Sequence, residues 1–281
     1  MSARAAGIGR RVRVVAGEEF RRAFETRWMF GFTLLLVALV LGLSYFGLAQ
    51  SREIGFQGFE RVTLSLMNLV LFIVPLTGLT LGVTSVTGGT GILALLLAQP
   101  VGRGEVLLGK FAGLGTALSV SLAIGFGAGG VLVALNAGAA QAGSFIVLAA
   151  ISLALGWLTV AAALGIAAVW PDRLQAMSAA LLLWLLMVVA YDLVVLGASA
   201  TFRGVPLQAI LFPSLILNPV DLARVVVMLS LGAGALFGPT AAVLARAFGA
   251  GAGIAVGLGV LSIETVVPLL IAVAVFRRRD W

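Results

Sequence analysis

The chain has 281 residues, of which 61% are hydrophobic and only 10% are charged, and its mean hydropathy is +1.16. Soluble domains are about half apolar and a quarter charged, so this composition predicts an all-α polytopic membrane protein. The chain has no Cys and no His, which excludes disulfides, thiolate or imidazole metal sites, and catalytic pairs of Ser or Cys with His within it. The net charge of +7 does not indicate nucleic-acid binding, because the basic residues stand at the ends of apolar runs and set membrane orientation there.

The first segments predict a surface helix followed by a membrane span. Residues 12–28 form an amphipathic pattern expected to lie on the cytoplasmic surface, with these apolar residues on one side: Val12, Val15, Ala16, Phe20, Ala23, Phe24 and Trp28. Residues 29–49 are about the 20 apolar residues that a bilayer needs, and seven arginines precede them. This first span is therefore predicted to begin in the cytoplasm and to cross outward.

The next apolar stretch contains one span and a cytoplasmic connector. After a polar tip at residues 51–61, the next charged residue is Arg103, a stretch too long for one span and too short for two spans with a turn. We therefore predict a second span at 62–86, a connector at 87–110 that contains a short leucine-rich helix, and a third span at 111–135. Pro100 is expected to end the connector helix.

Within this connector, the sequence GEVLLGKF from Gly104 to Phe111 fits the spacing G-x-x-x-x-G-K of a phosphate-binding loop. Phe111 stands where such a loop needs Ser or Thr to hold Mg²⁺, and no strand is predicted before it. The stretch is interpreted as part of the connector, and no cofactor is expected on this chain.

Three further spans are predicted, at 144–169, 176–197 and 253–276, with a periplasmic segment at 198–252. With six spans, both termini are cytoplasmic. A seventh span at 225–245 would place the arginines that follow Phe276 outside, against the positive-inside rule. We therefore expect 225–245 to lie against the outer membrane surface or to be tucked between the spans, where protein covers its backbone.

Two acidic residues fall within predicted spans, Asp192 and Glu264. An acid inside a membrane is costly and is by default functional, so both are candidates for a transport pathway or a subunit contact. Local pairing is the alternative for each of them. The six methionines are scattered singly and are interpreted as packing residues; copper, which binds thioethers, is the alternative, and no metal site is predicted.

A third candidate group lies in the predicted periplasmic segment. Asn218 followed by Pro219 and Asp221 is typical of a helix start, and Arg224 is at the right spacing to hold Asp221. The same rigid turn on the outer face is also where a periplasmic partner would bind.

The whole arrangement resembles the membrane subunits of ABC-2 type transporters: an amphipathic first helix, six spans, and the connector LLLAQPVGRGEVLLGKF between the second and third spans. The resemblance implies that the chain is not itself an enzyme and that the connector docks on a separate cytoplasmic ATPase, which binds ATP and Mg²⁺. It also implies ATPase coupling by Leu95, Leu96, Leu97, Pro100, Arg103, Glu105 and Lys110.

A narrower resemblance comes from AYDLVVLG at 190–197, LILNPVDLARV at 215–225 and the tail FRRRDW. Together these are similar to the NosY family, the permeases of the transporter needed for copper-site assembly in nitrous-oxide reductase. This implies a bacterial inner-membrane location, a NosF-like ATPase, a NosD-like periplasmic partner and two permease copies. The connector TSVTGGTGILALLLAQP lacks the acidic residues that relatives usually carry, a departure that bears on ATPase coupling. A general ABC-2 exporter of a lipid, glycan or hydrophobic compound is the alternative, and an assembly factor that moves nothing is a third possibility.

Overall fold

The computed structural model describes residues 2–54, 57–88, 101–136, 139–191, 193, 197, 216–231 and 239–278. The described elements are α1 (Ser2–Glu25), α2 (Arg27–Ile54), α3 (Gln57–Thr87), α5 (Arg103–Asn136), α6 (Ala139–Val169), α7 (Arg173–Leu185), the π-helix η1 (Leu186–Ala190), α10 (Pro219–Ser230) and α11 (Pro239–Arg278). Six stretches of this part of the chain are long and apolar enough to cross a membrane, and each overlaps one predicted span: Arg27–Tyr45, Thr63–Thr87, Arg103–Val131, Gly143–Val169, Arg173–Ala190 and Gly251–Arg278. The predicted all-α polytopic fold is confirmed.

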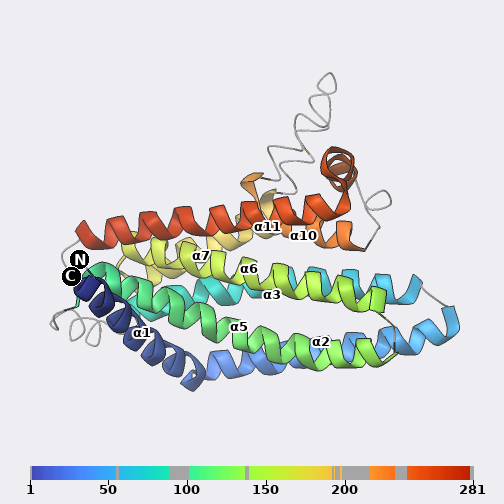
Figure 1. The fold of residues 1–281 in the computed structure, drawn as a ribbon, viewed down its shortest axis with the longest axis horizontal. Helices are drawn as coiled ribbons and strands as arrows, with labels where there is room; N and C mark the ends of the chain where they lie inside the picture. Colours follow the sequence, from blue (N-terminus) through green and yellow to red (C-terminus); the bar gives the residue numbers. More distant parts are fainter. Residues whose placement is uncertain are drawn as a thin grey trace.

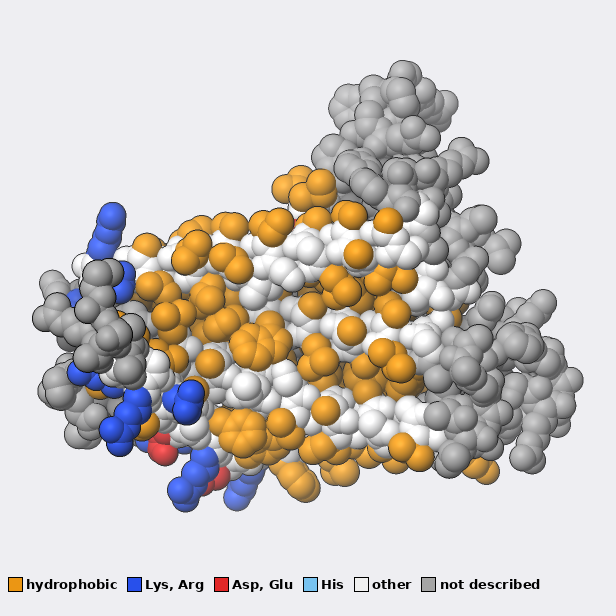
Figure 2. All heavy atoms as spheres, viewed as in Figure 1, with side chains coloured by type: hydrophobic (Ala, Val, Ile, Leu, Met, Phe, Trp, Pro, Cys, Tyr) orange, Lys and Arg blue, Asp and Glu red, His pale blue; other side chains and the backbone are white. Residues whose placement is uncertain are grey.

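The long helices lie side by side along the molecule, and both chain termini are at the same end (Figure 1). Lys and Arg side chains gather at that end, whereas hydrophobic side chains cover the body of the bundle (Figure 2). We call the end that carries the start of α1, the start of α5 and the end of α11 the basic end. An even number of spans places both termini on one side of a membrane, which fits this arrangement.

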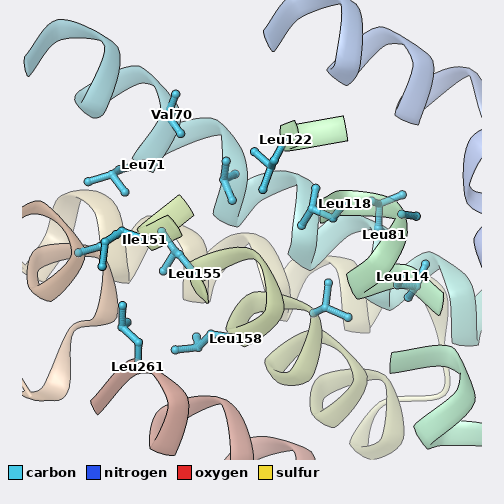
Figure 3. Packing of buried hydrophobic residues seen from close by; sticks show 14 of the residues in the cluster. Val70, Leu71, Leu81, Leu114, Leu118, Leu122, Ile151, Leu155, Leu158 and Leu261 are labelled. Carbon is cyan, nitrogen blue, oxygen red and sulfur yellow. The ribbon is translucent and has the colours of Figure 1, made fainter. Parts of the chain in front are cut away.

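The centre of the bundle is the contact between α3, α5 and α6, where buried Leu, Ile and Val side chains interdigitate (Figure 3). Close approach of α3 to α6 depends on Gly78 and Gly82, because a Cβ atom on either residue would overlap Thr159 or Ala163 of α6. This is the small-xxx-small spacing by which helices associate in lipid, where the hydrophobic effect does not drive them together. The same spacing recurs at Gly125 and Gly129 of α5, which receive Leu36 and Val40 of α2.

Two helices, α7 and α11, are much less covered than the centre of the bundle, and we call their uncovered faces the open flank. Only 11% of the residues in the membrane stretch of each are buried, against 61% in the stretch of α3 and 56% in that of α6. Large apolar side chains therefore stand open along this flank, including Leu174, Leu182, Leu186, Ile263, Leu270 and Ile271. In a bilayer such a face contacts either lipid or another chain.

Two boundaries differ from the sequence-based expectation. Helix α5 begins at Arg103, eight residues before the predicted start of the third span, so the last part of the predicted connector, residues 103–110, is continuous with the helix that carries this span. The sequence GEVLLGKF is thus helical and offers no loop for a phosphate.

The region expected at 225–245 is divided between two helices. Helix α10 is mostly buried and packs against α6 and α11, with Val226 seated at Gly257 of α11. Residues 239–245 belong to α11, which bends sharply at Gly249, where φ is +72°, before it enters its membrane stretch. Residues 225–230 therefore pack against spans of the bundle, whereas residues 232–238 lie outside the described residues.

Candidate functional site

At the basic end, α1 is packed directly on the start of α5. A Cβ atom on Gly113 would lie 2.5 Å from the carbonyl oxygen of Ala16, and one on Gly109 would lie 2.6 Å from Cβ of Val15. These two glycines have the same four-residue spacing as the other close helix contacts in the bundle. The buried face of α1, which the sequence predicts to rest on the membrane surface, therefore rests on protein.

A threonine bend separates α1 from the first span. The Thr26 hydroxyl donates to the carbonyl of Ala23 at 2.6 Å and accepts from the backbone N–H of Met29 at 3.3 Å, so it closes one helix and caps the next. Trp28, predicted on the same face as Ala23, lies beyond this bend in α2 and is 54% exposed. The bend is what lets α1 turn away from α2 and onto α5.

The contact between α1 and α5 encloses a charged pair. Lys110 Nζ of α5 lies 2.8 Å from Glu19 Oε2 of α1, and the two side chains are only 6% and 9% exposed. The same ammonium donates to the Ser85 carbonyl at 2.9 Å and to Ser85 Oγ at 3.0 Å, and Ser85 Oγ also donates to Glu19. All three donors of the lysine are thus used. We call Glu19, Ser85 and Lys110 the basic-end lock.

This lock connects three helices that are distant in sequence. Glu19 belongs to α1, Ser85 to the last turn of α3, and Lys110 to the first turns of α5. A buried pair of this kind is destabilising unless its geometry and hydrogen bonds are complete, and breaking one partner leaves an uncompensated charge. Because the bonds here are complete, the lock fixes the relative position of the three helices at this end.

Two other predicted coupling residues lie at the start of α5, outside the lock. Glu105 accepts a hydrogen bond from the Gly102 backbone N–H at 3.2 Å and lies 3.6 Å from Arg11 of α1. Arg103 is partly exposed. By contrast, Lys110 is 4% exposed and is occupied by the lock, so it is not presented to a docked protein. The predicted docking residues Leu95, Leu96, Leu97 and Pro100 lie outside the described residues.

Towards the opposite end, Asn218 organises the start of α10. Its Oδ1 accepts from the Val220 backbone N–H at 3.1 Å, which makes it the N-cap, and Pro219 occupies the first helical position as predicted. Its Nδ2 donates to the Met187 carbonyl at 2.8 Å. Met187 lies in the π-helical η1, where the altered hydrogen-bond register is typical of functional segments. Asn218 therefore ties α10 to the fifth span.

The predicted contact between Asp221 and Arg224 is present. Arg224 Nη1 lies 2.8 Å from Asp221 Oδ1, and Asn218 Nδ2 lies 3.1 Å from Asp221 Oδ2. We call Asn218, Asp221 and Arg224 the outer cluster. Asp192, the candidate acid of the fifth predicted span, lies outside the described residues.

Glu264 lies in the membrane stretch of α11 and is neither fully buried nor fully exposed. Its Oε2 is buried and has no hydrogen-bond partner in the described part of the chain. Its sequence neighbour Ile263 is 64% exposed, whereas the unsatisfied oxygen itself is buried within the monomer. An acid in a membrane stretch is costly and is by default functional, so Glu264 stays a candidate for a transport pathway or a subunit contact.

A family profile described as "ABC-2 family transporter protein" matches residues 13–281. The chain belongs to the ABC-2 transporter family. It is 32% identical over 276 residues to the "Probable ABC transporter permease protein NosY" of Stutzerimonas stutzeri, which covers 94% of this chain and 97% of the relative. It is 31% identical over 218 residues to the protein of the same name from Pseudomonas aeruginosa, covering 75% of this chain and 79% of the relative.

Membership of the ABC-2 family defines the class of protein. The chain is a multi-pass membrane permease, and permeases of this family work with a cytoplasmic ABC ATPase. The basic-end lock therefore lies at both ends of the connector that was predicted to dock on that ATPase, because Ser85 precedes this connector and Lys110 is its last residue.

The sequence analysis did not find Glu19 or Ser85. A signal was available: Glu19 follows Val15 by four residues and precedes Ala23 by four, so it lies in the middle of the apolar face. A single acid at such a position predicts a buried basic partner, although not which one.

Proposed function

We propose that this chain is the permease subunit of a NosY-like transporter, which couples ATP hydrolysis by a NosF-like ATPase to transport, or to mechanical work, during maturation of the copper sites of periplasmic nitrous-oxide reductase. The observation that carries the proposal is the similarity to NosY permeases over 94% of the chain. In this proposal the basic end is cytoplasmic and the membrane is the bacterial inner membrane, in agreement with the positive-inside rule. ATP and Mg²⁺ are bound by the ATPase.

The geometry of the basic end supports a coupling role. An ATPase that docks on the connector acts between Ser85 and Lys110, and these residues are joined to each other and to Glu19. Displacement of the connector is then transmitted to α1, α3 and α5 together, because the lock and the tight glycine contacts prevent one helix from moving alone. Through its hydrogen bond with Ser85, Glu19 supplies a carboxylate next to the stretch TSVTGGTGILALLLAQP, which has no acid of its own.

At the opposite end, we assign binding of a NosD-like periplasmic protein to the region before α10. Asn218 is 1% exposed and is used internally, so it shapes this region and does not itself bind a partner. Ile216 and Leu217, which immediately precede it, are 49% and 74% exposed. Two open apolar residues held against a capped helix are a suitable contact for a partner protein.

Two copies of the permease are proposed to associate through the open faces of α7 and α11. Because the chain has no Cys, single cysteines provide a clean test. Leu182→Cys and Ile271→Cys should cross-link in membranes, whereas Leu34→Cys on α2, which is equally open at 60% exposure, should not. Cross-linking of Leu34→Cys alone would mean that the second copy contacts α2 and not α7 and α11.

The test of the proposed function is co-purification of this chain with the products of neighbouring genes, followed by measurement of copper in nitrous-oxide reductase from a strain that lacks the chain. We expect an ATPase and a periplasmic protein to co-purify, and the reductase to be deficient in copper. Leu95→Glu with Leu97→Glu should release the ATPase alone. Val14→Glu, at a 66% exposed position of α1 outside the connector and outside the open flank, is the control.

The alternative function, a general ABC-2 exporter of a lipid, glycan or hydrophobic compound, predicts a different result. It requires an ATPase but no dedicated periplasmic protein, and the copper content of the reductase would be unchanged. If the double glutamate variant and the Val14→Glu control release the ATPase equally, the connector is not the docking site.

A further inference from the structure

Two cavities adjoin along a crease between α3 and the bend that joins α1 to α2. The first, of about 300 Å³, is lined by the lock residues and by Arg22, Thr26, Thr84 and Arg173; we call it the basic cavity. The second, of about 240 Å³, is lined by Arg27, Trp28, Gly31, Phe32, Leu35 and Ile73, among others; we call it the apolar cavity. A volume near 300 Å³ is at the lower end of the range of small-molecule sites.

The two cavities share both walls. On α3, Ile73 and Thr77 line the apolar cavity, and the next turns of the same helix, through Thr84 to Gly88, line the basic cavity. On the other wall, Thr26 ends one cavity and Arg27 begins the other. From residue 73 to residue 88 the helix rises about 22 Å, against about 15 Å for half of the hydrocarbon core of a bilayer. The crease is therefore long enough to follow one leaflet and its headgroup.

The charge of the crease is concentrated at one end. Lys110 and Glu19 neutralise each other, and Arg22 is paired with Glu18 at 2.8 Å. Arg27 and Arg173 are exposed, and within the described part of the chain neither is joined to an acidic side chain by an ion pair. Two open guanidinium groups thus stand at the basic cavity and at its border, beside the hydroxyls of Thr26 and Thr84. Guanidinium groups bind phosphate oxygens in a two-pronged geometry.

Trp28 stands at the border between the cavities, next to Arg27, where the first apolar membrane stretch begins. Trp28 is 54% exposed there, and Trp is enriched at the boundary between hydrocarbon and headgroups. On one side of Trp28 the crease is apolar, with Phe32, Leu35 and Ile73; on the other side it is cationic. A small soluble anion would contact the cationic half of the crease and leave the apolar half unoccupied.

We propose that this crease binds one anionic phospholipid of the cytoplasmic leaflet, with its phosphate between Arg27 and Arg173 and an acyl chain in the apolar cavity. The choice of leaflet depends on the orientation proposed above, whereas the site itself does not depend on the cargo. The bound headgroup lies against Ser85 and Gly88, at the end of α3 where the connector begins. The lipid thus contacts both α1 and α3 beside the basic-end lock.

The test is native mass spectrometry of the detergent-purified chain titrated with phosphatidylglycerol or with phosphatidylcholine of the same acyl chains. Wild type should retain one phosphatidylglycerol in preference to phosphatidylcholine. Loss of two cationic contacts in Arg27→Gln with Arg173→Gln should weaken this binding by about thirtyfold. The control, Arg10→Gln with Arg13→Gln, removes the same charge from exposed positions of α1 outside both cavities and should bind as wild type.

A second pair of variants tests the acyl-chain half. Gly31 has open space around its Cβ position in the apolar cavity, so Gly31→Trp fills the cavity without strain, whereas Gly42→Trp fills open space elsewhere on α2. Gly31→Trp should lose the lipid and Gly42→Trp should keep it. Equal weakening by the two arginine pairs overturns the proposal in favour of general surface charge. Unchanged binding in Gly31→Trp, or full competition by glycerol phosphate, overturns it in favour of a soluble anion; melting temperatures of all variants establish that each is folded.

Discussion

The basic-end lock and the outer cluster are both charged and both reach into the protein, yet they hold the fold in different ways. Lys110 and Glu19 are 91 residues apart, only 6% and 9% exposed, and connected to a third helix through Ser85. Arg224 and Asp221 are three residues apart on a single helix and are 26% and 17% exposed. The first group joins helices to one another. The second orders the start of one helix, and Asn218 links it to another span through the Met187 carbonyl.

The largest effect should come from breaking the lock at one partner. Lys110→Met leaves the Glu19 carboxylate buried without a counter-charge, which should lower the free energy of unfolding by about 3–5 kcal/mol. Thermal or denaturant unfolding in detergent measures this loss. In contrast, Asp221→Asn in the outer cluster, where water reaches the pair, should cost about 1 kcal/mol or less.

A double substitution sharpens the same comparison. Glu19→Leu with Lys110→Met removes both charges and should recover most of the lost stability, because a buried ion pair is often replaceable by apolar side chains of similar volume. If the lock transmits motion from the connector, this stable double variant should nevertheless uncouple ATP hydrolysis from transport. Full retention of coupling would reduce the lock to a structural role.

The next largest effect concerns the packing that encloses the lock. Gly113→Leu places a side chain where a Cβ alone would lie 2.5 Å from the Ala16 carbonyl oxygen, and should destabilise the protein by about 2–3 kcal/mol through displacement of α1. Protease sensitivity of α1 and the unfolding midpoint both report this. Gly127→Leu on the same helix, where nothing lies within 4 Å, is the control and should be neutral.

A smaller effect is expected at the outer cluster. Asn218→Ala removes the N-cap of α10 and the hydrogen bond to the Met187 carbonyl, and should cost about 1–2 kcal/mol. Hydrogen exchange should rise in α10 and η1 but not in α1. Asn68→Ala, at an exposed position of α3, is the matched control. A loss as large as that of Lys110→Met would contradict the view that the outer cluster acts locally.

Features that depend on local sequence could be predicted, whereas contacts between distant residues could not. Six spans could be predicted because apolar runs of bilayer length and the placement of basic residues are local features. The turn at Asn218-Pro219 and the Asp221–Arg224 pair are also local, and both were predicted. That α5 extends back to Arg103 was not predicted, because Arg103, Glu105 and Lys110 were interpreted as a charged connector. Lys110 can be buried because its charge is paired with the carboxylate of Glu19, 91 residues away in the sequence. No local sequence pattern reveals such a distant partner.

The smallest effect is expected one residue from the lock. The hydrogen bond and charge of Arg22 lower the pKa of Glu18 from its usual value of 4.5. A lowered pKa contributes stability only above the unfolded-state pKa, and that contribution disappears as the pH falls through the folded-state value. Because the pair is exposed, Arg22→Gln should return the pKa of Glu18 towards 4.5 in a carboxyl NMR titration without a measurable change in melting temperature. Glu18 and Glu19 are adjacent in sequence, so a melting-temperature loss in Arg22→Gln comparable to that of Lys110→Met would mean that proximity to α5, and not burial of the charge, is what makes this end of the molecule sensitive.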